Sequence, residues 1–448
     1  MFEDLFGKQV VARFDQPDSS SDGGALLLKA CDERLGLTQA LSDCLVDSRQ
    51  PGKVVHELRD LIRQRVYGLG CGYEDCNDAA RLKSDAIHKM LIDRDPVQGL
   101  DLASQASLSR FENGVSATEL MRMGNALADR VIKHHKRRLG KRAKRITVEL
   151  DPTDDQTHGG QQLSFFNGFY RGYCYLPMTG FVQFNDEPDQ HLFAYVLRGG
   201  DAGPARGALG ILDRILTRLA AAFPKARVLV RLDAGFCGPA LFDLLEAHGV
   251  GYVVAMAKNS VLSGHAQPWL KPLRRRSKQT EQSHKDYGEC DYKARSWGLA
   301  RRVIFKAEVL AYEGRASKDN ARFVVTNLKQ TPKWVYERIY CARANIENRI
   351  KELKLDLVIG RTSCTSFKAN QFRALLAASA YVLFQMLRAK AADTDLRNAQ
   401  VRTLRERLIK LGVWVTRSAR RIVLHLPDSA PWRNEWCRIA RSLGAVPG

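Results

Sequence analysis

The stretch "RITVELD", Arg145 to Asp151, decides the fold class of this chain. Its apolar residues alternate, so that Ile146, Val148 and Leu150 lie on one face, as in a β-strand with one buried side. Two more strands are predicted in "YCYLPMTGFVQF" and "HLFAYVLRGGD", followed by an amphipathic helix in "ARGALGILDRILTRLAAAF". A strand, a helix and a strand follow in "ARVLVRLDAGF", "PALFDLLEAHGV" and "GYVVAMAKN". This order predicts a mixed α/β sheet that helices cover.

The segments on either side of this core have other patterns. Residues 24–139 have apolar positions three and four apart and are predicted to be helical, with a capping box from Ser116 to Glu119. After Asn259 no helix is expected, and residues 260–320 are interpreted as a basic, mostly β insertion. "ARFVVTNL" returns to the sheet, and Thr331-Pro332 fits the start of a long helix.

Charge indicates the class of partner. The 448 residues include 70 Lys and Arg against 49 Asp and Glu, a formal net charge of +21. This excess favours a polyanion such as nucleic acid, with an anionic membrane as the rival. Because the apolar run from Ala374 to Phe384 has eleven residues, and a membrane span needs about 20, we expect no membrane partner. No signal peptide is recognised, so a cytoplasmic protein is expected.

One basic run stands out between the helical segment and the first strand. Lys133 to Arg145 holds eight Lys and Arg in thirteen residues and no acid. Such a run is either a solvated linker or a DNA contact. The candidate DNA-contacting residues in it are Lys136, Arg137 and Arg138. The ten cysteines show no paired spacing, and "CGYEDC", with Cys71 and Cys76, lacks the second pair of a zinc site.

Three carboxylates carry the chemical hypothesis. Asp151 and Asp233 each end a predicted strand, where open α/β sheets place ligands. Glu347 lies on the long helix, at the margin of its apolar face. Carboxylates brought together repel, so they stay ionised only beside cations, and two Mg²⁺ ions would hold both oxygens of a phosphoryl transfer. Alternatively, Glu347 forms ordinary surface ion pairs with Arg343 and Lys351.

The first aspartate has rivals close by. Asp154 and Asp155 lie three and four residues beyond Asp151, and a shifted strand end would make either the ligand. Asp151 is preferred because of its strand register, and the other pair suits turn chemistry. On the long helix, Arg343, Lys351 and Lys354 are predicted to contact phosphates, and Tyr340 is a further candidate DNA-binding residue. The aromatic stretch "LSFFNGFYRGYCY" is interpreted as core because of its strand spacing, rather than as a base-stacking surface.

Four motifs now give a specific resemblance. Tyr340, Arg343, Glu347 and Lys354 reproduce the Tyr-x2-Arg-x3-Glu-x6-Lys signature of bacterial insertion-sequence transposases with an Asp-Asp-Glu site. "DPTDDQTHG" resembles their Asp-x-Thr motif, and "RLDAGF" their Asp-x-Gly-Phe motif. "ASQASLSRFEN" and "RRIVLHLP" are similar to one branch of the group, so the resemblance covers nearly the whole chain.

The resemblance implies a DNA transposase with a ribonuclease-H-like core. Asp151, Asp233 and Glu347 would bind two Mg²⁺ or Mn²⁺ ions, and the enzyme would cleave the element's ends and join them to target DNA. A homodimer pairing two terminal inverted repeats, acting at the bacterial nucleoid, is implied as well. Trp297, in the insertion, would hold a flipped base, unless it forms a small hydrophobic core there.

These interpretations divide the chain into five regions. Residues 1–140 are the expected helical region that binds terminal inverted repeats, 141–259 and 321–390 the two parts of the catalytic core, 260–320 the β-rich insertion, and 391–448 a basic C-terminal region. Two alternatives stay open: a metal-dependent nuclease of the same fold that cuts without strand transfer, and an inactive DNA-binding descendant.

Overall fold

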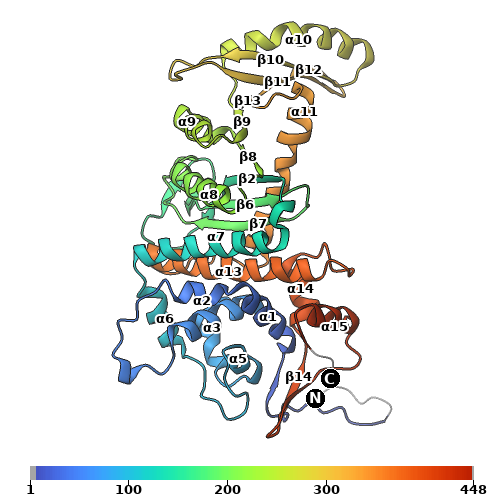
Figure 1. The fold of residues 1–448 in the computed structure, drawn as a ribbon. Helices are drawn as coiled ribbons and strands as arrows, with labels where there is room; N and C mark the ends of the chain where they lie inside the picture. The colour runs from blue at the N-terminus through green and yellow to red at the C-terminus, as the bar shows by residue number, and fades with distance from the viewer. Residues whose placement is uncertain (1–6, 446–448) are drawn as a thin grey trace. The chain divides into compact units, whose positions relative to one another are not determined.

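A computed structural model describes residues 7–445 and separates them into two compact units (Figure 1). One unit joins the chain up to Gly114 with the chain from Ser379 onward, and the other is Val115–Ala378. The five predicted regions, including their boundaries at residues 140 and 390 and the functions assigned to them, stay predictions.

The first unit is mainly helical, as expected for residues 24–113. Its helices before Gly114 are α1 (Leu26–Leu35), α2 (Leu37–Ser42), α3 (Leu58–Cys71), α4 (Ala79–Leu82), α5 (Ala86–Leu91) and α6 (Gln105–Asn113). Its later elements are α14 (Val401–Leu404), the π-helical η8 (Arg405–Ile409), β14 (Val413–Arg417), β15 (Ile422–His425) and α15 (Arg433–Ser442). β14 and β15 pair antiparallel, and β1 (Ser19–Ser20) joins them along β14.

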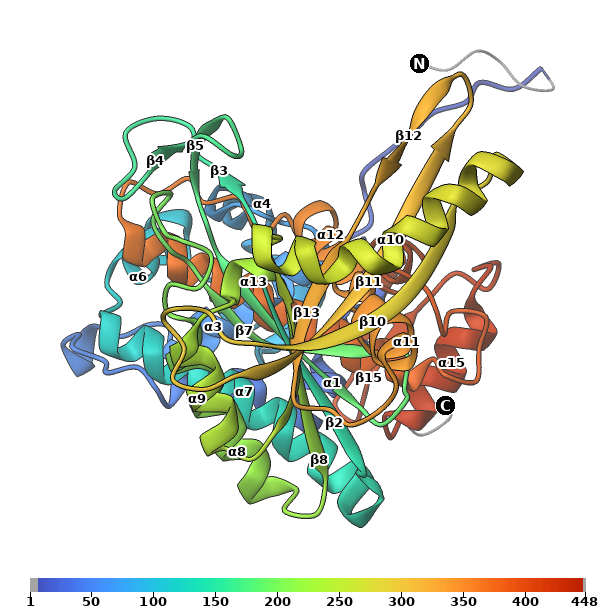
Figure 2. The same cartoon turned by 90° about the horizontal axis from the view of Figure 1, so that it is seen from above.

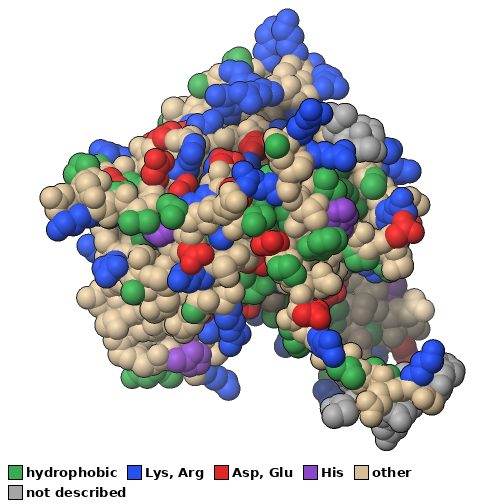
Figure 3. Space-filling view, turned by 90° about the horizontal axis from the view of Figure 1, so that it is seen from below, with side chains coloured by type: hydrophobic (Ala, Val, Ile, Leu, Met, Phe, Trp, Pro, Cys, Tyr) green, Lys and Arg blue, Asp and Glu red, His purple; other side chains and the backbone are tan. Residues whose placement is uncertain are grey.

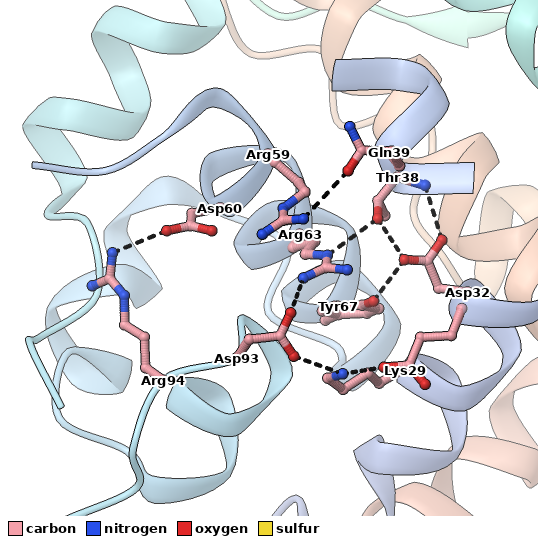
Figure 4. A network of polar contacts seen from close by, with 11 residues as sticks. Lys29, Asp32, Thr38, Gln39, Arg59, Asp60, Arg63, Tyr67, Asp93 and Arg94 are labelled. Carbon is pink, nitrogen blue, oxygen red and sulfur yellow. Dashed lines mark hydrogen bonds and ion pairs between the residues drawn. The ribbon is translucent and has the colours of Figure 1, made fainter. Parts of the chain in front are cut away.

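A polar network ties the first helices together (Figure 4). Asp32 at the end of α1 is buried, and its carboxylate accepts hydrogen bonds from the Thr38 backbone and the Tyr67 hydroxyl, both at 2.8 Å. Arg63 of α3 pairs with Asp93, which also pairs with Lys29 at 2.8 Å. Because each buried charge meets an opposite charge or a donor, this polar interior is compatible with a stable helical unit.

The second unit is built on a mixed sheet, which confirms the α/β prediction. The described strands run in the order β10-β11-β13-β9-β8-β2-β6-β7. β6 pairs antiparallel with β2 and with β7, whereas β2, β8 and β9 run parallel. The strand bounds are β2 (Arg145–Pro152), β6 (Met178–Phe184), β7 (Gln190–Val196), β8 (Arg227–Leu232), β9 (Gly251–Met256), β10 (His284–Tyr292), β11 (Arg301–Tyr312), β12 (Arg315–Asp319) and β13 (Arg322–Thr326).

Helices flank this sheet, and most fall where the apolar spacing placed them. They are α7 (Ala117–Leu139), α8 (Ala208–Ala222), α9 (Pro239–Ala247), α10 (Ser260–Thr280), α11 (Pro332–Trp334), α12 (Asn345–Leu355) and α13 (Phe367–Lys390). Ser116 and Glu119 form the predicted capping box of α7. Between α11 and α12 the long helix is irregular, with a π-helical segment η6 (Val335–Tyr340) and a 3-10 segment η7 (Cys341–Ala344).

The expectation of no helix after Asn259 is wrong. The Asn259 side chain accepts a hydrogen bond from the Leu262 backbone and caps α10, which buries Leu262, Ala266, Leu270 and Leu273. Two internal prolines and a run of arginines concealed this apolar spacing. The strands that follow do not form a subdomain apart, because β10 and β11 extend the main sheet through β13.

A small separate sheet lies beside the main one (Figure 2). It consists of β3 (Asp155–Gln156), β5 (Gly172–Tyr175) and β4 (Phe165–Asn167), in that order. The interpretation of the aromatic stretch here as core is wrong for most of its rings. Phe166, Phe169 and Tyr173 are 60%, 86% and 62% exposed. Only the end of the stretch, at Cys174 and Tyr175, is buried, because two short strands have little sheet to pack on.

Candidate functional site

Two aspartates meet at one edge of the main sheet. Asp151 is near the end of β2, and Asp233 directly follows β8. Because β2 and β8 are neighbouring parallel strands with Glu149 opposite Arg231, their carboxyl ends place both aspartates side by side. The Asp233 carboxylate accepts a hydrogen bond from the Gly235 backbone at 2.9 Å, which fixes the turn.

The third predicted carboxylate, Glu347, is on α12. The apolar stripe of the long helix is buried as predicted, with Val335, Ile346 and Leu353 among its buried residues. Val335 and Tyr336 pack on strands β9, β11 and β13. This packing brings Glu347, itself exposed, within electrostatic reach of Asp151. Burial raises the pKa of Asp151 to about 6, and the charges of Asp233 and Glu347 act in the same direction.

Arg343 provides the positive charge at the centre of this site. Its Nη2 donates to Oδ1 of Asp151 at 2.7 Å and lies 3.8 Å from Oδ2 of Asp233. The Arg343 charge opposes the rise in the pKa of Asp151. The guanidinium thus neutralises part of the negative charge of two converging carboxylates.

The other two aspartates after β2 have different partners. Asp154 receives a hydrogen bond from Lys354 Nζ at 2.7 Å. Asp155 is buried and accepts a bond from the Thr362 hydroxyl at 2.9 Å. Burial raises the pKa of Asp155 to about 7. Asp151 is therefore the aspartate that shares Arg343 with Asp233, although its role as a metal ligand stays a prediction.

The remaining predicted DNA-contacting residues lie in varied surroundings. Tyr340 is half-buried, 5.3 Å from the ring of Tyr336, and Lys351 is exposed. On α7, Lys136 and Arg137 are exposed, whereas Arg138 donates to both carboxylate oxygens of Glu187 at 2.9 and 2.6 Å. Arg138 is thus already neutralised.

Trp297 does not present a face to a base. The residue is 5% exposed, and its ring packs 5.1 Å from Phe242 and 5.6 Å from Tyr292, with the Arg301 guanidinium 5.5 Å from its centroid. This agrees with the other interpretation, a small hydrophobic core. The loop that holds Trp297 packs on α9 and β10, and the composition of the loop did not reveal this.

A buried ion pair beneath the aspartates was missed. Arg231 Nε lies 3.0 Å from Glu149 Oε1, and both side chains are at most 5% exposed. Arg231 Nη1 also donates to the backbone oxygen of Ile339 at 3.0 Å, in the π-helical segment η6. The signal in the sequence was a charged residue two positions before each strand-end aspartate, in "VELD" and "VRLD".

The donor set of the site suits a hard divalent cation. Carboxylate oxygens are the preferred ligands of Mg²⁺ and Mn²⁺. Within residues 7–445, however, only one group of three potential metal-binding side chains has all its ligand atoms within 4.8 Å of one another. It consists of Asp22, Cys71 and His88, in the first unit. There Lys410 Nζ contacts Asp22 at 2.7 Å and already supplies a cation. Cys71 thus lies with His88 rather than forming a motif with Cys76.

Basic side chains recur over the surface. On the face drawn in Figure 3, Lys and Arg are spread over the surface with Asp and Glu between them, rather than gathered in one patch. Within the described residues, no helix is long and apolar enough to cross a membrane.

An α/β protein with two aspartates at adjoining strand ends, a glutamate on the facing helix and arginine between them has the chemistry of an enzyme that acts on phosphate esters. The comparison with known families makes this specific. The model of the family described as transposase DDE domain group 1 matches residues 2–447, so the chain belongs to this family. No curated protein matches the chain.

Membership defines the general activity. The protein is a transposase, and its substrate is DNA, which it cuts and transfers in recombination. The high positive charge agrees with this substrate.

Proposed function

We propose that this protein is an insertion-sequence transposase that binds terminal inverted repeats, cleaves DNA at the element's ends and joins those ends to target DNA. The observation that carries the proposal is the meeting of Asp151 and Asp233 at neighbouring strand ends, with Glu347 close enough to influence the pKa of Asp151. The Tyr-x2-Arg-x3-Glu-x6-Lys pattern from Tyr340 to Lys354 supports the same assignment.

The catalytic core is proposed to be ribonuclease-H-like. In chain order, strands β2, β6 and β7 are antiparallel neighbours, and β8 and β9 continue the sheet in parallel on the other side of β2. In this topology the first and fourth of these strands adjoin, and Asp151 and Asp233 lie at their ends. The long helix packs on β9, and this packing would bring Glu347 to the edge of the sheet that holds the two aspartates.

Asp151, Asp233 and Glu347 are the proposed ligands of two Mg²⁺ or Mn²⁺ ions. The ions, when bound, would act as Lewis acids on the attacking and leaving oxygens of phosphoryl transfer. The Arg343 guanidinium, which now pairs with Asp151, would then be available to bind a DNA phosphate. Asp154 pairs with Lys354 and is left out of the proposed ligand set, while exposed Lys351 would contact the DNA backbone. Tyr340 positions the helix through its ring contact with Tyr336.

Recognition of the element is assigned to the helical region of residues 1–140. Lys136 and Arg137 on α7 are exposed at the end of this region and would neutralise phosphates. A homodimer would pair two element ends, and the place of action is the bacterial nucleoid in the cytoplasm. The support for these statements is the resemblance of the motifs and the basic charge of the chain.

The metal-dependent nuclease is the second candidate, because it would use the same three carboxylates. A transposase differs from it by joining the freed 3′ end to other DNA. An inactive descendant is disfavoured, since all three expected carboxylates are present.

The test is to incubate full-length protein with DNA carrying the element's own ends, with Mg²⁺ or with a chelator, and to map the products. Nicks at the repeat ends and joined products that need the metal would support the proposal. Nicks without joining would favour the nuclease, and a lack of any metal-dependent cleavage would refute the enzyme assignment.

A further inference from the structure

The β4–β5 hairpin that follows the first aspartate exposes several large aromatic rings. Phe165 and Phe166 of β4 are 42% and 60% exposed, and Phe169 in the turn is 86% exposed. Because neighbouring residues of a strand point to opposite faces, Phe165 and Phe166 lie on opposite faces of the hairpin. Phe166 packs 5.8 Å from the ring of Tyr173, whereas Phe165 lines a groove on the other face.

That groove is open, basic and large enough for a nucleotide. Its volume is about 600 Å³, and Phe165 shares its wall with Arg198, Arg206 and Arg214. Asp201, also in the wall, lies 3.5 Å from Arg206 and offsets one of the three positive charges. We call this surface the Phe165 groove.

Arg198 is a buried cation with an unused donor. It is 7% exposed, and its Nε and Nη1 donate to backbone oxygens, including those of Leu176 and Pro204, at 2.7–3.1 Å. Its Nη2 is buried and has no partner, and among residues 7–445 no carboxylate pairs with Arg198. Burial lowers the pKa of Arg198 to about 10, and the neighbouring Arg206 acts in the same direction. An unpaired buried charge is costly, so this groove suits an anion.

The hairpin and the loop after Arg198, which both line the groove, are connected to the turn that holds the second aspartate. Asn167 of the hairpin donates to the Gly200 backbone at 3.0 Å, which ties the hairpin to the loop after Arg198. That loop touches the second aspartate's turn, since a Cβ on Gly235 would lie only 2.6 Å from Pro204. Burial raises the pKa of the Tyr170 hydroxyl, and the charges of Asp154, Asp151 and Asp233 contribute to the rise. The hairpin therefore reaches the edge where the aspartates meet.

We propose that the Phe165 groove binds an unpaired stretch of the DNA strand beside the phosphate on which the carboxylates act. One base stacks on Phe165, and the phosphates on either side contact Arg206 and Arg214, while the buried charge of Arg198 attracts them from within the wall. A basic groove combined with an aromatic ring is how proteins bind single strands without reading sequence. A base inside a duplex has no free face, so the ring selects unpaired nucleotides. The inference rests on the proposed function.

The test compares two DNA ends: a blunt duplex and the same duplex with a three-nucleotide single-stranded overhang carrying 2-aminopurine. Affinity is measured by fluorescence anisotropy, and stacking by quenching of 2-aminopurine. Wild-type protein binds the overhang more tightly and quenches its fluorescence. Phe165→Ala weakens overhang binding about tenfold, loses the quenching and leaves blunt-end binding unchanged, whereas Phe165→Trp restores both.

Phe166→Ala is the matched control, because it removes the same ring from the same hairpin on the face away from the groove. Its overhang affinity stays at the wild-type value. The double variant Arg206→Gln with Arg214→Gln lowers the salt slope of overhang binding by about 1.4, at 0.7 for each lost single-strand phosphate contact. An unchanged overhang affinity in Phe165→Ala, or an equal loss in Phe166→Ala, would overturn the inference.

The test also separates this inference from the function on which it rests. A wild-type protein that cleaves and joins element ends, yet binds both DNA ends equally, would refute only the groove. A wild-type protein that neither cleaves nor joins DNA would refute the proposed function.

Discussion

At the scale of single residues, the aspartates at the strand ends differ in their partners and in their burial. Asp233 is held in a turn by a backbone donor, and Asp151 is balanced by Arg343. Asp155, four residues beyond Asp151, accepts a hydrogen bond from Thr362, and burial raises its pKa to about 7. Asp151, Asp154 and Asp155 lie within five positions of the chain but have different partners. Their spacing in the sequence therefore left open which of them is the first ligand.

Asp155 gives a prediction about pH. Because its pKa is raised from 3.8 to about 7 in the folded protein, the folded state holds a proton that the unfolded state releases. The stability from the neutral carboxyl is complete below about pH 4 and is lost as pH rises to about 7. Asp155→Asn keeps the acceptor for Thr362, so it should raise stability at pH 8 by about 2–4 kcal/mol and flatten the pH dependence.

Thermal denaturation of wild type and variant from pH 4 to 8 measures this effect. Asp186→Asn is the control, since its carboxylate is 79% exposed and should change stability little at any pH. Parallel pH curves for wild type and Asp155→Asn would contradict the assignment of Asp155 as a buried, neutral group.

At the scale of elements, the long helix that carries Arg343 and Glu347 is not a regular α-helix. The π-helical segment η6 leaves the Ile339 carbonyl to accept a bond from Arg231, which lies on β8 and pairs with Glu149 of β2. The two strands that end near Asp151 and Asp233 are thereby connected to the helix that carries Glu347.

This arrangement predicts the effect of breaking the pair. Arg231→Met leaves Glu149 buried without a cation and should lower stability by about 3–5 kcal/mol at pH 8. Adding Glu149→Gln removes the stranded charge and keeps an acceptor for Gln190, so the double variant should recover most of the loss. Thermal denaturation of both variants checks this. A double variant no more stable than Arg231→Met would show that the charge of Glu149 is not the cause.

Sequence patterns predicted the elements that are both regular and half-buried. The strands β2, β6, β7, β8 and β9 were recognised by alternating or continuous apolar residues, and the helices α8 and α9 by their spacing. Helix α10 was missed because Pro268 and Pro272 interrupt it, and the β4–β5 hairpin was misjudged because aromatic strand residues are usually covered. The strand-end aspartates were predictable from topology, whereas the Arg343 bridge, the Arg231–Glu149 pair and the Arg198 loop depend on contacts between residues distant in the chain.

At the scale of the whole molecule, the net charge of +21 indicates strongly salt-dependent DNA binding. The exposed pair Lys136 and Arg137 on α7 should contribute to it, whereas Arg138 is neutralised by Glu187. Lys136→Gln with Arg137→Gln should reduce the slope of log affinity against log salt by about 2, at 0.9 for each lost duplex phosphate contact. Arg138→Gln should reduce it less, although it removes a charge from the same helix.

Affinity titrations between 50 and 200 mM salt measure these slopes on DNA with and without the repeats. Sequence preference should stay the same in all variants, because phosphate contacts carry no sequence information. A slope unchanged in the double variant would show that this part of α7 is the solvated linker and not a DNA contact.

The most direct measurement of the central claim is strand transfer by full-length protein on DNA with the element's ends and Mg²⁺, comparing wild type, Glu347→Gln and Glu337→Gln. Glu337 lies on the same helix but pairs with Lys285 outside the carboxylate site, so its variant controls for loss of one charge. The account predicts that Glu347→Gln binds the ends but neither cleaves nor joins them, with activity down by at least about a hundredfold, while Glu337→Gln stays active. Cleavage and joining by Glu347→Gln at the wild-type rate would make this glutamate a helix-surface charge and contradict the claim.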